Sequence, residues 1–215
     1  MTESINKRAR GLYAIIDPEV CSRDPEQVAR AVLRGGCAML QLRDKRSSDP
    51  DVVQLGKKLA AACRAHQVPF VLNDRYWLVP EVGAQGAHVG QTDAPLEQAR
   101  SELGSGYMIG VSTHSFEQAE DAAKRGADLI GFGPVFGTST KADHDPVVGL
   151  EALQQVVQQL AIPVVAIGGI QLSRAAAIAQ TGVPLAAAVS AICSADNPEQ
   201  AARDLHAALR QAHTE

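Results

Sequence analysis

The sequence has few aromatic residues and no long apolar run. Only 4% of its 215 residues are aromatic although 46% are hydrophobic, so Ala, Val, Leu and Ile must fill the core. This composition suits parallel strands that are buried on both faces. No stretch of 18 apolar residues is present, so we expect neither a transmembrane helix nor a membrane partner.

Concentrated charge and closely spaced cysteines are also missing. The net charge is −4 and no block of five like charges occurs, so a nucleic-acid partner is not expected. The four cysteines have no CxxC spacing, which favours reduced thiols in a cytoplasmic protein over disulfides or a zinc site. Residues 1–11 are charged and lack the apolar centre of a signal peptide, and we interpret them as an N-terminal extension.

Short apolar runs alternate with amphipathic helical stretches along the whole chain. Their spacing is typical of βα units, and eight runs are expected to be strands. These runs cover residues 12–16, 39–42, 70–72, 87–89, 108–111, 129–132, 164–167 and 185–189. Eight units predict an α/β fold with one domain over residues 1–215, a (β/α)₈ TIM barrel. An open doubly wound sheet is the alternative with the same alternation.

Three helix starts carry capping signals. Asp49 is expected to cap a helix over residues 49–66, with a proline in the first turn, where its missing N–H is not needed. Asn197 is expected to cap the last helix, with Gln200 placed to reach back. Ser115 and Gln118 repeat that arrangement after the fifth strand.

Polar residues follow seven of the eight predicted strands, at the end of a barrel where active sites lie. Arg43 and Lys45 after the second strand, and Lys141 after the sixth, supply cationic donors suited to phosphate oxygens. Asp74 and Asp93 follow the third and fourth strands, and a pair of carboxylates suits one Mg²⁺ ion. Alternatively, these carboxylates form salt bridges to a neighbouring arginine or cap helices.

The last two strand ends suggest a second anion site. Gly168 and Gly169 have no Cβ, so their backbone allows close approach of a ligand. Ser190 adds a hydroxyl and a backbone N–H, and the loops after strands 7 and 8 frequently bind phosphate in barrels. Alternatively, the two glycines only fit a tight turn.

The loop after the sixth strand, residues 133–149, is the longest polar connection. Thr138, Ser139 and Thr140 bring hydroxyl groups beside Lys141, an arrangement that suits an anion. Loops of this length are often lids that exclude water from a site. Alternatively, the loop is a flexible surface excursion.

Seven segments together resemble the thiamine phosphate synthase family. They are QLRDK (41–45), LNDR (72–75), HVGQTD (88–93), GVSTH (110–114), GFGPVFGTSTK (131–141), AIGGI (166–170) and VSAI (189–192). The segments occur in the order and spacing of that family. The resemblance implies a (β/α)₈ transferase that requires Mg²⁺. Its small phosphorylated substrates are hydroxymethylpyrimidine pyrophosphate and hydroxyethylthiazole phosphate, and its products are thiamine phosphate and pyrophosphate.

The resemblance also implies roles for individual residues. The expected Mg²⁺ ligands are Asp74 and Asp93. The expected contacts of the pyrimidine pyrophosphate are Gln41, Arg43, Lys45, Asn73, Ser112 and Lys141. The expected contacts of the thiazole phosphate are Thr138, Ser139, Thr140, Gly169, Val189 and Ser190. The residues expected to assist departure of pyrophosphate, and therefore to be catalytic, are Arg43, Lys45, Ser112 and Lys141.

Two features depart from the family pattern. Gly137 stands where the family often has proline, and residues 143–148 are less typical. Two other functions remain open, an isomerase like the thiazole tautomerases, which use a histidine near the position of His114, and a non-catalytic phosphate-binding barrel. A sugar-phosphate epimerase would need acid and base carboxylates or metal-binding histidines, which are not evident. We interpret His88 as structural, and the sequence does not fix an oligomeric state.

Overall fold

The computed structural model describes residues 9–138 and 146–211. Its strands follow one another around the sheet in chain order. They are β1 (Gly11–Ile16), β2 (Met39–Leu42), β3 (Phe70–Asn73), β4 (Gly86–Val89), β5 (Met108–Thr113), β6 (Leu129–Phe132), β7 (Val164–Ala166) and β8 (Leu185–Ala188). Every predicted strand is present, and no strand end differs from its predicted position by more than two residues.

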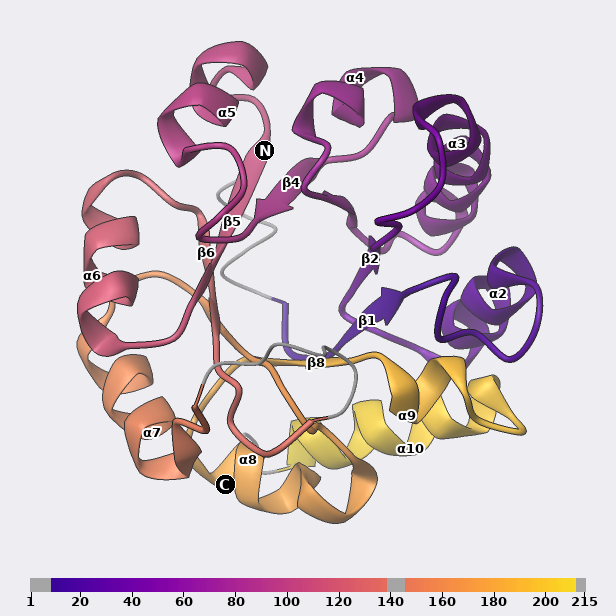
Figure 1. Ribbon diagram of the computed structural model, residues 1–215. Coiled ribbons are helices and arrows are strands. Elements are labelled where there is room, and N and C mark those ends of the chain that lie inside the picture. Colours follow the sequence, from indigo (N-terminus) through magenta and orange to yellow (C-terminus); the bar gives the residue numbers. More distant parts are fainter. Residues whose placement is uncertain (1–8, 139–145, 212–215) are drawn as a thin grey trace.

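The sheet closes on itself between its first and last strands. All pairs are parallel, and β1 pairs with both β2 and β8, with Gly11 opposite Leu185 and Ala14 opposite Ala188. The predicted (β/α)₈ TIM barrel is therefore confirmed, and the open doubly wound sheet is wrong. Figure 1 shows the strands inside a ring of helices. The active-site end of such a barrel is the end at which the strands finish.

Helices cover the outside of the barrel between successive strands. They are α2 (Pro25–Gly35), α3 (Asp49–Ala65), α4 (Val79–Val82), α5 (Leu96–Leu103), α6 (Phe116–Lys124), α7 (Gly149–Gln159), α8 (Ala175–Gln180), α9 (Ser190–Cys193) and α10 (Pro198–Gln211), with 3₁₀ turns η1 (Tyr76–Leu78) and η2 (Leu172–Arg174). Within the described ranges, no helix combines the length and the apolar character needed to cross a membrane.

Two of the three predicted caps are correct and one is displaced. Asn197 accepts from the Gln200 amide at 3.1 Å, and Ser115 accepts from the Gln118 amide at 3.2 Å. Asp49 does not cap α3, because Ser48 takes that position and accepts from the Asp51 amide at 3.4 Å. Asp49 is instead the first helical residue, where its negative charge interacts favourably with the positive end of the helix dipole.

Strand residues alternate between two hydrophobic clusters, because successive side chains of a strand point to opposite faces. Leu12 and Ala14 pack outward under the helices. Tyr13 points inward, into a cluster with Met39, Val71, Met108, Leu129, Val165, Leu185 and Ala187. The next inward position along β2 is Gln41, which therefore faces the mouth of the barrel rather than the helices.

At the opposite end of the barrel, polar side chains satisfy the backbone where strands begin. The Leu12 amide donates to His206 Nδ1 at 3.1 Å, and the Phe70 amide donates to Gln85 Oε1 at 2.7 Å. The Ile109 amide donates to Asp128 Oδ2 at 2.8 Å. A buried N–H without an acceptor is costly, so these side chains stabilise the strand starts.

Candidate functional site

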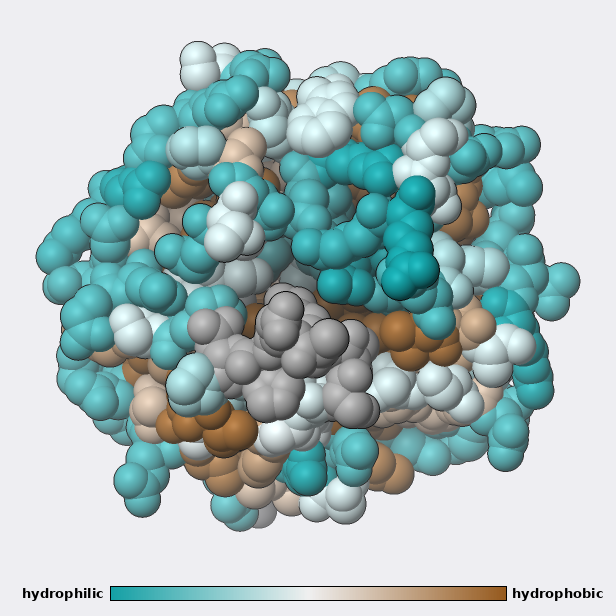
Figure 2. All heavy atoms as spheres, in the orientation of Figure 1, coloured by the Kyte–Doolittle hydropathy of each residue, from teal (hydrophilic) through white to brown (hydrophobic). Residues whose placement is uncertain are grey.

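A cavity opens at the end of the barrel where the strands finish. Its wall includes eight residues that the sequence predicts as substrate contacts: Gln41, Arg43, Asn73, Ser112, Thr138, Gly169, Val189 and Ser190. They come from β2, β3 and β5, from the loops that follow β2, β6, β7 and β8, and from the first residue of α9. Residues far apart in the sequence thus meet at one mouth. Figure 2 shows hydrophilic side chains gathered on the β2–β4 side of this face.

The floor of the cavity contains a tyrosine that sequence reasoning missed. Tyr13 is 1% exposed and lines the cavity, and its hydroxyl accepts from Gln41 Nε2 at 2.8 Å. Burial raises the pKa of Tyr13, so the phenol stays neutral. The sequence did contain a signal for Tyr13. Side chains along a strand alternate between its two faces, so Tyr13 and Ile15 share the inward face of β1.

His88, interpreted from the sequence as structural, also lies in the cavity wall. Its Nε2 is 2.9 Å from Ser112 Oγ on the neighbouring strand. Two inward glycines make room for the ring, since a Cβ on Gly110 would lie 2.4 Å from His88 Nδ1 and one on Gly131 would lie 3.1 Å from its Cε1. The imidazole and Ser112 therefore form one hydrogen-bonded unit across β4 and β5.

Arg43 is held by an acidic residue that the sequence analysis overlooked. Asp17 is 1% exposed and forms a short ion pair through Oδ2 with Arg43 Nη1. A buried carboxylate requires such a partner, and the pair fixes the guanidinium at the cavity wall. Asp17 directly follows β1, the one strand after which no polar cluster was noted. Its position at a strand end could have identified it as a residue at the mouth of the barrel.

Asp74 and Asp93 come together at the neighbouring rim, as the strand order predicts. Burial is the main cause that raises the pKa of Asp74, followed by its hydrogen bond to Asp93 and the negative charge of that carboxylate. Lys45 opposes this rise, with its Nζ 3.1 Å from Asp74 Oδ2. The Gly90 amide donates to Asp93 Oδ2 at 2.8 Å. The salt-bridge interpretation thus holds for Asp74, although its partner is a lysine.

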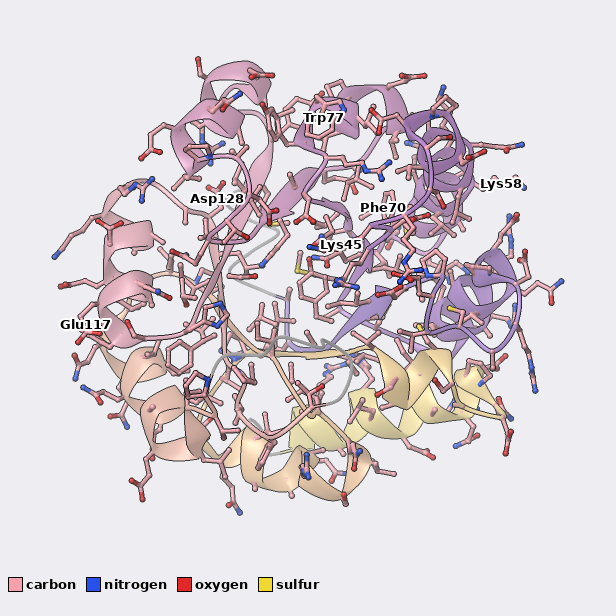
Figure 3. All side chains as sticks on the ribbon, in the orientation of Figure 1. Lys45, Lys58, Phe70, Trp77, Glu117 and Asp128 are labelled. Carbon is pink, nitrogen blue, oxygen red and sulfur yellow. The ribbon has the colours of Figure 1, made fainter. Side chains whose placement is uncertain are left out.

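This carboxylate pair fits a divalent cation. Two adjacent carboxylates repel each other when both are ionised, and a cation between them removes that repulsion. The described residues contain no group of three or more His, Cys, Asp or Glu side chains that would form a closed metal site. Mg²⁺ is commonly held by one or two carboxylates, with water and substrate phosphates completing its shell. Figure 3 shows Lys45 toward the middle of the molecule, with Lys58 and Glu117 at the outer edge of the ring of helices.

The opposite wall of the cavity is made mainly of backbone. Gly168 and Gly169 have positive φ angles of 91° and 65°. A Cβ on Gly168 would lie 2.4 Å from Pro134, and one on Gly169 would lie 2.7 Å from the Gly137 carbonyl. The pair therefore serves the tight turn, and it also lets the loop after β6 pack directly against the loop after β7.

Comparison with known proteins adds to this geometry. The family model described as thiamine monophosphate synthase matches residues 12–192. The chain belongs to this family. Curated thiamine-phosphate synthases are similar over most of their length. That of Archaeoglobus fulgidus is 41% identical over 93% of this chain and 93% of its own, and that of Syntrophomonas wolfei is 43% identical over 90% and 93%.

Solved structures agree with the thiamine monophosphate synthase family assignment. The thiamine phosphate pyrophosphorylase of Pyrococcus furiosus matches with a TM-score of 0.87 and 33% identity, over 97% of this chain and 98% of its own. A geranylgeranylglyceryl phosphate synthase from Thermoplasma acidophilum matches with a TM-score of 0.70 but 17% identity, which supports the barrel fold alone. The expectation of a transferase from this family is thus confirmed, over the isomerase and the non-catalytic barrel.

Three predicted site residues of this thiamine monophosphate synthase family member, Ser139, Thr140 and Lys141, lie outside the described residues. Their roles remain predictions from the resemblance. The beginning of the same loop lines the cavity through Gly137 and Thr138. His114, the residue that suggested an isomerase, also lines it, and its Nδ1 is 2.6 Å from the Gly133 carbonyl.

Proposed function

We propose that this chain joins hydroxymethylpyrimidine pyrophosphate to hydroxyethylthiazole phosphate, forming thiamine phosphate and pyrophosphate with the help of Mg²⁺. The observation that carries the proposal is the acidic pair Asp74 and Asp93 with Lys45 beside it, next to a cavity whose wall includes the cation Arg43. A pyrophosphate leaving group needs positive charge around its oxygens, and a metal needs carboxylates. The residues that follow β2, β3 and β4 supply both.

Asp74 and Asp93 would hold the metal ion. When bound there, Mg²⁺ supplies positive charge that stabilises a departing pyrophosphate. Arg43, kept in place by Asp17, offers a planar fork of N–H donors to the same oxygens. Lys45 adds a point charge, and we assign Lys141 a similar role from the family resemblance.

Gln41, Asn73 and Ser112 are proposed to orient the pyrimidine. All three face inward from strands, so their positions are set by the rigid barrel rather than by loops. Gln41 is fixed by Tyr13 and Ser112 by His88. In our proposal the reactive methylene carbon of the pyrimidine faces the opposite wall. There Gly169, Val189 and Ser190 hold the thiazole phosphate together with Thr138, Ser139 and Thr140.

The proposed reaction needs no protein nucleophile. The C–O bond to pyrophosphate breaks, and both electrons leave with the oxygen. The pyrimidine-methyl cation that remains is stabilised by electrons of its own ring. The thiazole nitrogen then gives its lone pair to the methylene carbon and forms the new C–N bond. Catalysis is therefore positioning combined with electrostatic stabilisation of the leaving group.

Product formation from the two substrates tests the proposal. The purified protein is incubated with both compounds, with Mg²⁺ or with a chelator, and thiamine phosphate is measured. We expect product only when Mg²⁺ is present. Absence of product under both conditions would contradict the proposed reaction. Equal amounts of product under both conditions would contradict the proposed role of Mg²⁺.

A further inference from the structure

Two cysteines from the first and last βα units meet beside the cavity. Cys21 lies in the loop after β1 and is partly exposed, whereas Cys193 ends α9 and is buried. An interaction between their side chains shifts the pKa values of both thiols in opposite directions, and both thiols are free. They are separated by most of the chain, so only closure of the barrel brings them together (Figure 1).

The backbone around the two thiols is already joined. The Ser22 amide donates to the Cys193 carbonyl at 3.1 Å, and the Ser194 hydroxyl donates to the Val20 carbonyl at 3.1 Å. The Cys193 Sγ lies 3.4 Å from the Ile15 carbonyl oxygen, which is a second acceptor for its single proton. These bonds hold the two segments close together, and close backbone approach is what a disulfide requires.

We propose that Cys21 and Cys193 form a peroxide-sensitive dithiol, which oxidises to a disulfide between the first and last units of the barrel. The two segments that it joins adjoin the cavity. Asp17, which pairs with the cavity residue Arg43, accepts from the Cys21 amide through its backbone carbonyl at 3.0 Å, and the cavity residue Ser190 opens the helix that ends in Cys193. Oxidation therefore joins the segment that holds Arg43 to the helix that presents Ser190.

The reactivity of the pair is asymmetric. The hydrogen bond from Cys193 is the main cause that lowers the pKa of Cys21, whereas the same bond, together with burial, raises the pKa of Cys193. Because the thiolate is the nucleophile, Cys21 is the thiol that attacks an oxidant. Burial raises the pKa of Cys37 and raises that of Cys63 to about 12, so these two thiols serve as internal controls.

The oxidant is a hydroperoxide, and the steps balance. The Cys21 sulfur attacks one peroxide oxygen, the O–O bond breaks, and water leaves as the sulfenic acid forms. The Cys193 sulfur then attacks the Cys21 sulfur. An S–S bond forms, the S–O bond breaks, and the hydroxyl leaves as water with the Cys193 proton. In sum, two thiols and one hydrogen peroxide give one disulfide and two waters.

Intact mass and thiol counting after hydrogen peroxide treatment test the proposal on the full chain. We expect the wild-type protein to lose two hydrogen atoms and two of its four thiols, and to regain them with dithiothreitol. Peptide mapping should place the bridge between Cys21 and Cys193. A protein that keeps four thiols, or that forms a bridge through Cys37 or Cys63 or between two chains, would overturn the proposal.

Single variants separate the two sulfurs. Cys21→Ser should keep its three remaining thiols, because the attacking sulfur is gone. Cys193→Ser should accumulate a sulfenic acid at Cys21 that dimedone traps. Cys63→Ser, the matched control, should still form the bridge. Rapid oxidation of Cys193 in the Cys21→Ser variant would contradict the assignment. If a variant fails to fold, the wild-type mass and peptide map still decide.

Thermal unfolding gives a second measurement. The bridge closes a loop of most of the chain, and such a closure constrains the unfolded state strongly. The oxidised protein should therefore unfold several degrees above the reduced protein, and Cys21→Ser should show no such difference after the same treatment. A lower midpoint for the oxidised protein would mean that the thiols are not placed for bridging, and it would contradict the proposal.

Discussion

The two ends of the barrel use the same kinds of polar residue for different purposes. Where the strands finish, Gln41 and Ser112 turn inward and line a cavity. Where the strands begin, His206, Gln85 and Asp128 accept from backbone amides. One end therefore presents its polar groups to a ligand, and the other uses them to complete the fold. Substitutions where the strands finish should mainly lower turnover, and substitutions where the strands begin should mainly lower the free energy of unfolding.

The largest expected effect is at the mouth. The double variant Asp17→Asn with Arg43→Gln should reduce turnover on the order of 10²–10³-fold, because it removes a donor for the leaving group. Its free energy of unfolding should change by less than about 2 kcal/mol, since no buried charge is left unpaired. Steady-state kinetics and urea unfolding measure both quantities.

The single variant Arg43→Gln is the control for that prediction. It leaves the buried Asp17 carboxylate without its partner and should destabilise the fold by about 3–5 kcal/mol. If the double variant keeps near-normal turnover, Arg43 does not stabilise the leaving group. That result would contradict the division of roles between the two ends of the barrel.

Asp93→Asn should have the next largest effect. The amide oxygen still accepts from the Gly90 amide, but the negative charge is lost. The Mg²⁺ concentration for half-maximal activity should rise about 10–100-fold, as expected for loss of a metal ligand. The pKa of Asp74 should fall, because the Asp93 charge helps to raise it.

Glu120→Gln, also on the outside of the barrel in α6, is the control for the metal prediction. It removes a solvent-exposed carboxylate that pairs with Lys124, and it should leave the Mg²⁺ requirement unchanged. An equal shift in both variants would indicate a general effect of charge rather than a metal site at the rim.

At the opposite end, Asp128→Ala should lower the free energy of unfolding by about 2–3 kcal/mol, because the Ile109 amide loses its acceptor and Arg100 loses its partner. Turnover of the folded protein should not change. Asp128→Asn keeps an acceptor oxygen and should cost less. Figure 3 labels this side chain. A loss of turnover without a loss of stability would break the comparison.

The smallest expected effect is a pH dependence of stability from His206. Burial first, and the charge of Arg210 second, lower the pKa of His206 below 6.5 in the folded protein. As the pH falls through about 6.5, His206 binds a proton in the unfolded chain but not yet in the folded protein, so the free energy of unfolding decreases. The decrease ends once the pH is below the folded pKa.

The variant His206→Gln isolates this effect. Glutamine offers an acceptor for the Leu12 amide but does not titrate. The free energy of unfolding, measured by urea titration from about pH 7 to about pH 5, should therefore fall less steeply than in the wild-type protein. Identical slopes would mean that His206 does not contribute to the pH dependence.

The sequence alone allowed prediction of the strands and of most of the cavity wall. Apolar runs bounded by turns mark β1 to β8, because strands buried on both faces need continuous hydrophobic segments. Residues directly after those runs lie at the mouth, since all strands of a parallel barrel finish at the same end. Arg43, Asp74 and Asp93 were identified in this way, whereas Gln41, Asn73 and Ser112 were implied by the resemblance to the family.

Tyr13 and Asp17 were not identified, and the partner of His88 was not, because each of these contacts depends on a residue of another strand or loop. Tyr13 accepts from Gln41, Asp17 pairs with Arg43, and His88 contacts Ser112. Hydrophobic periodicity is local, whereas a hydrogen bond between side chains depends on which strands are neighbours and on their register.

The sequence by itself thus determined the order of the elements and the end of the barrel at which chemistry is possible. Closure decided the rest. Pairing of β1 with β8 places Asp17 and Cys21 next to the segment from Val189 to Cys193. The physical reason is that a closed sheet leaves no edge strand, so the first and last units must become neighbours, and only then do their polar side chains meet.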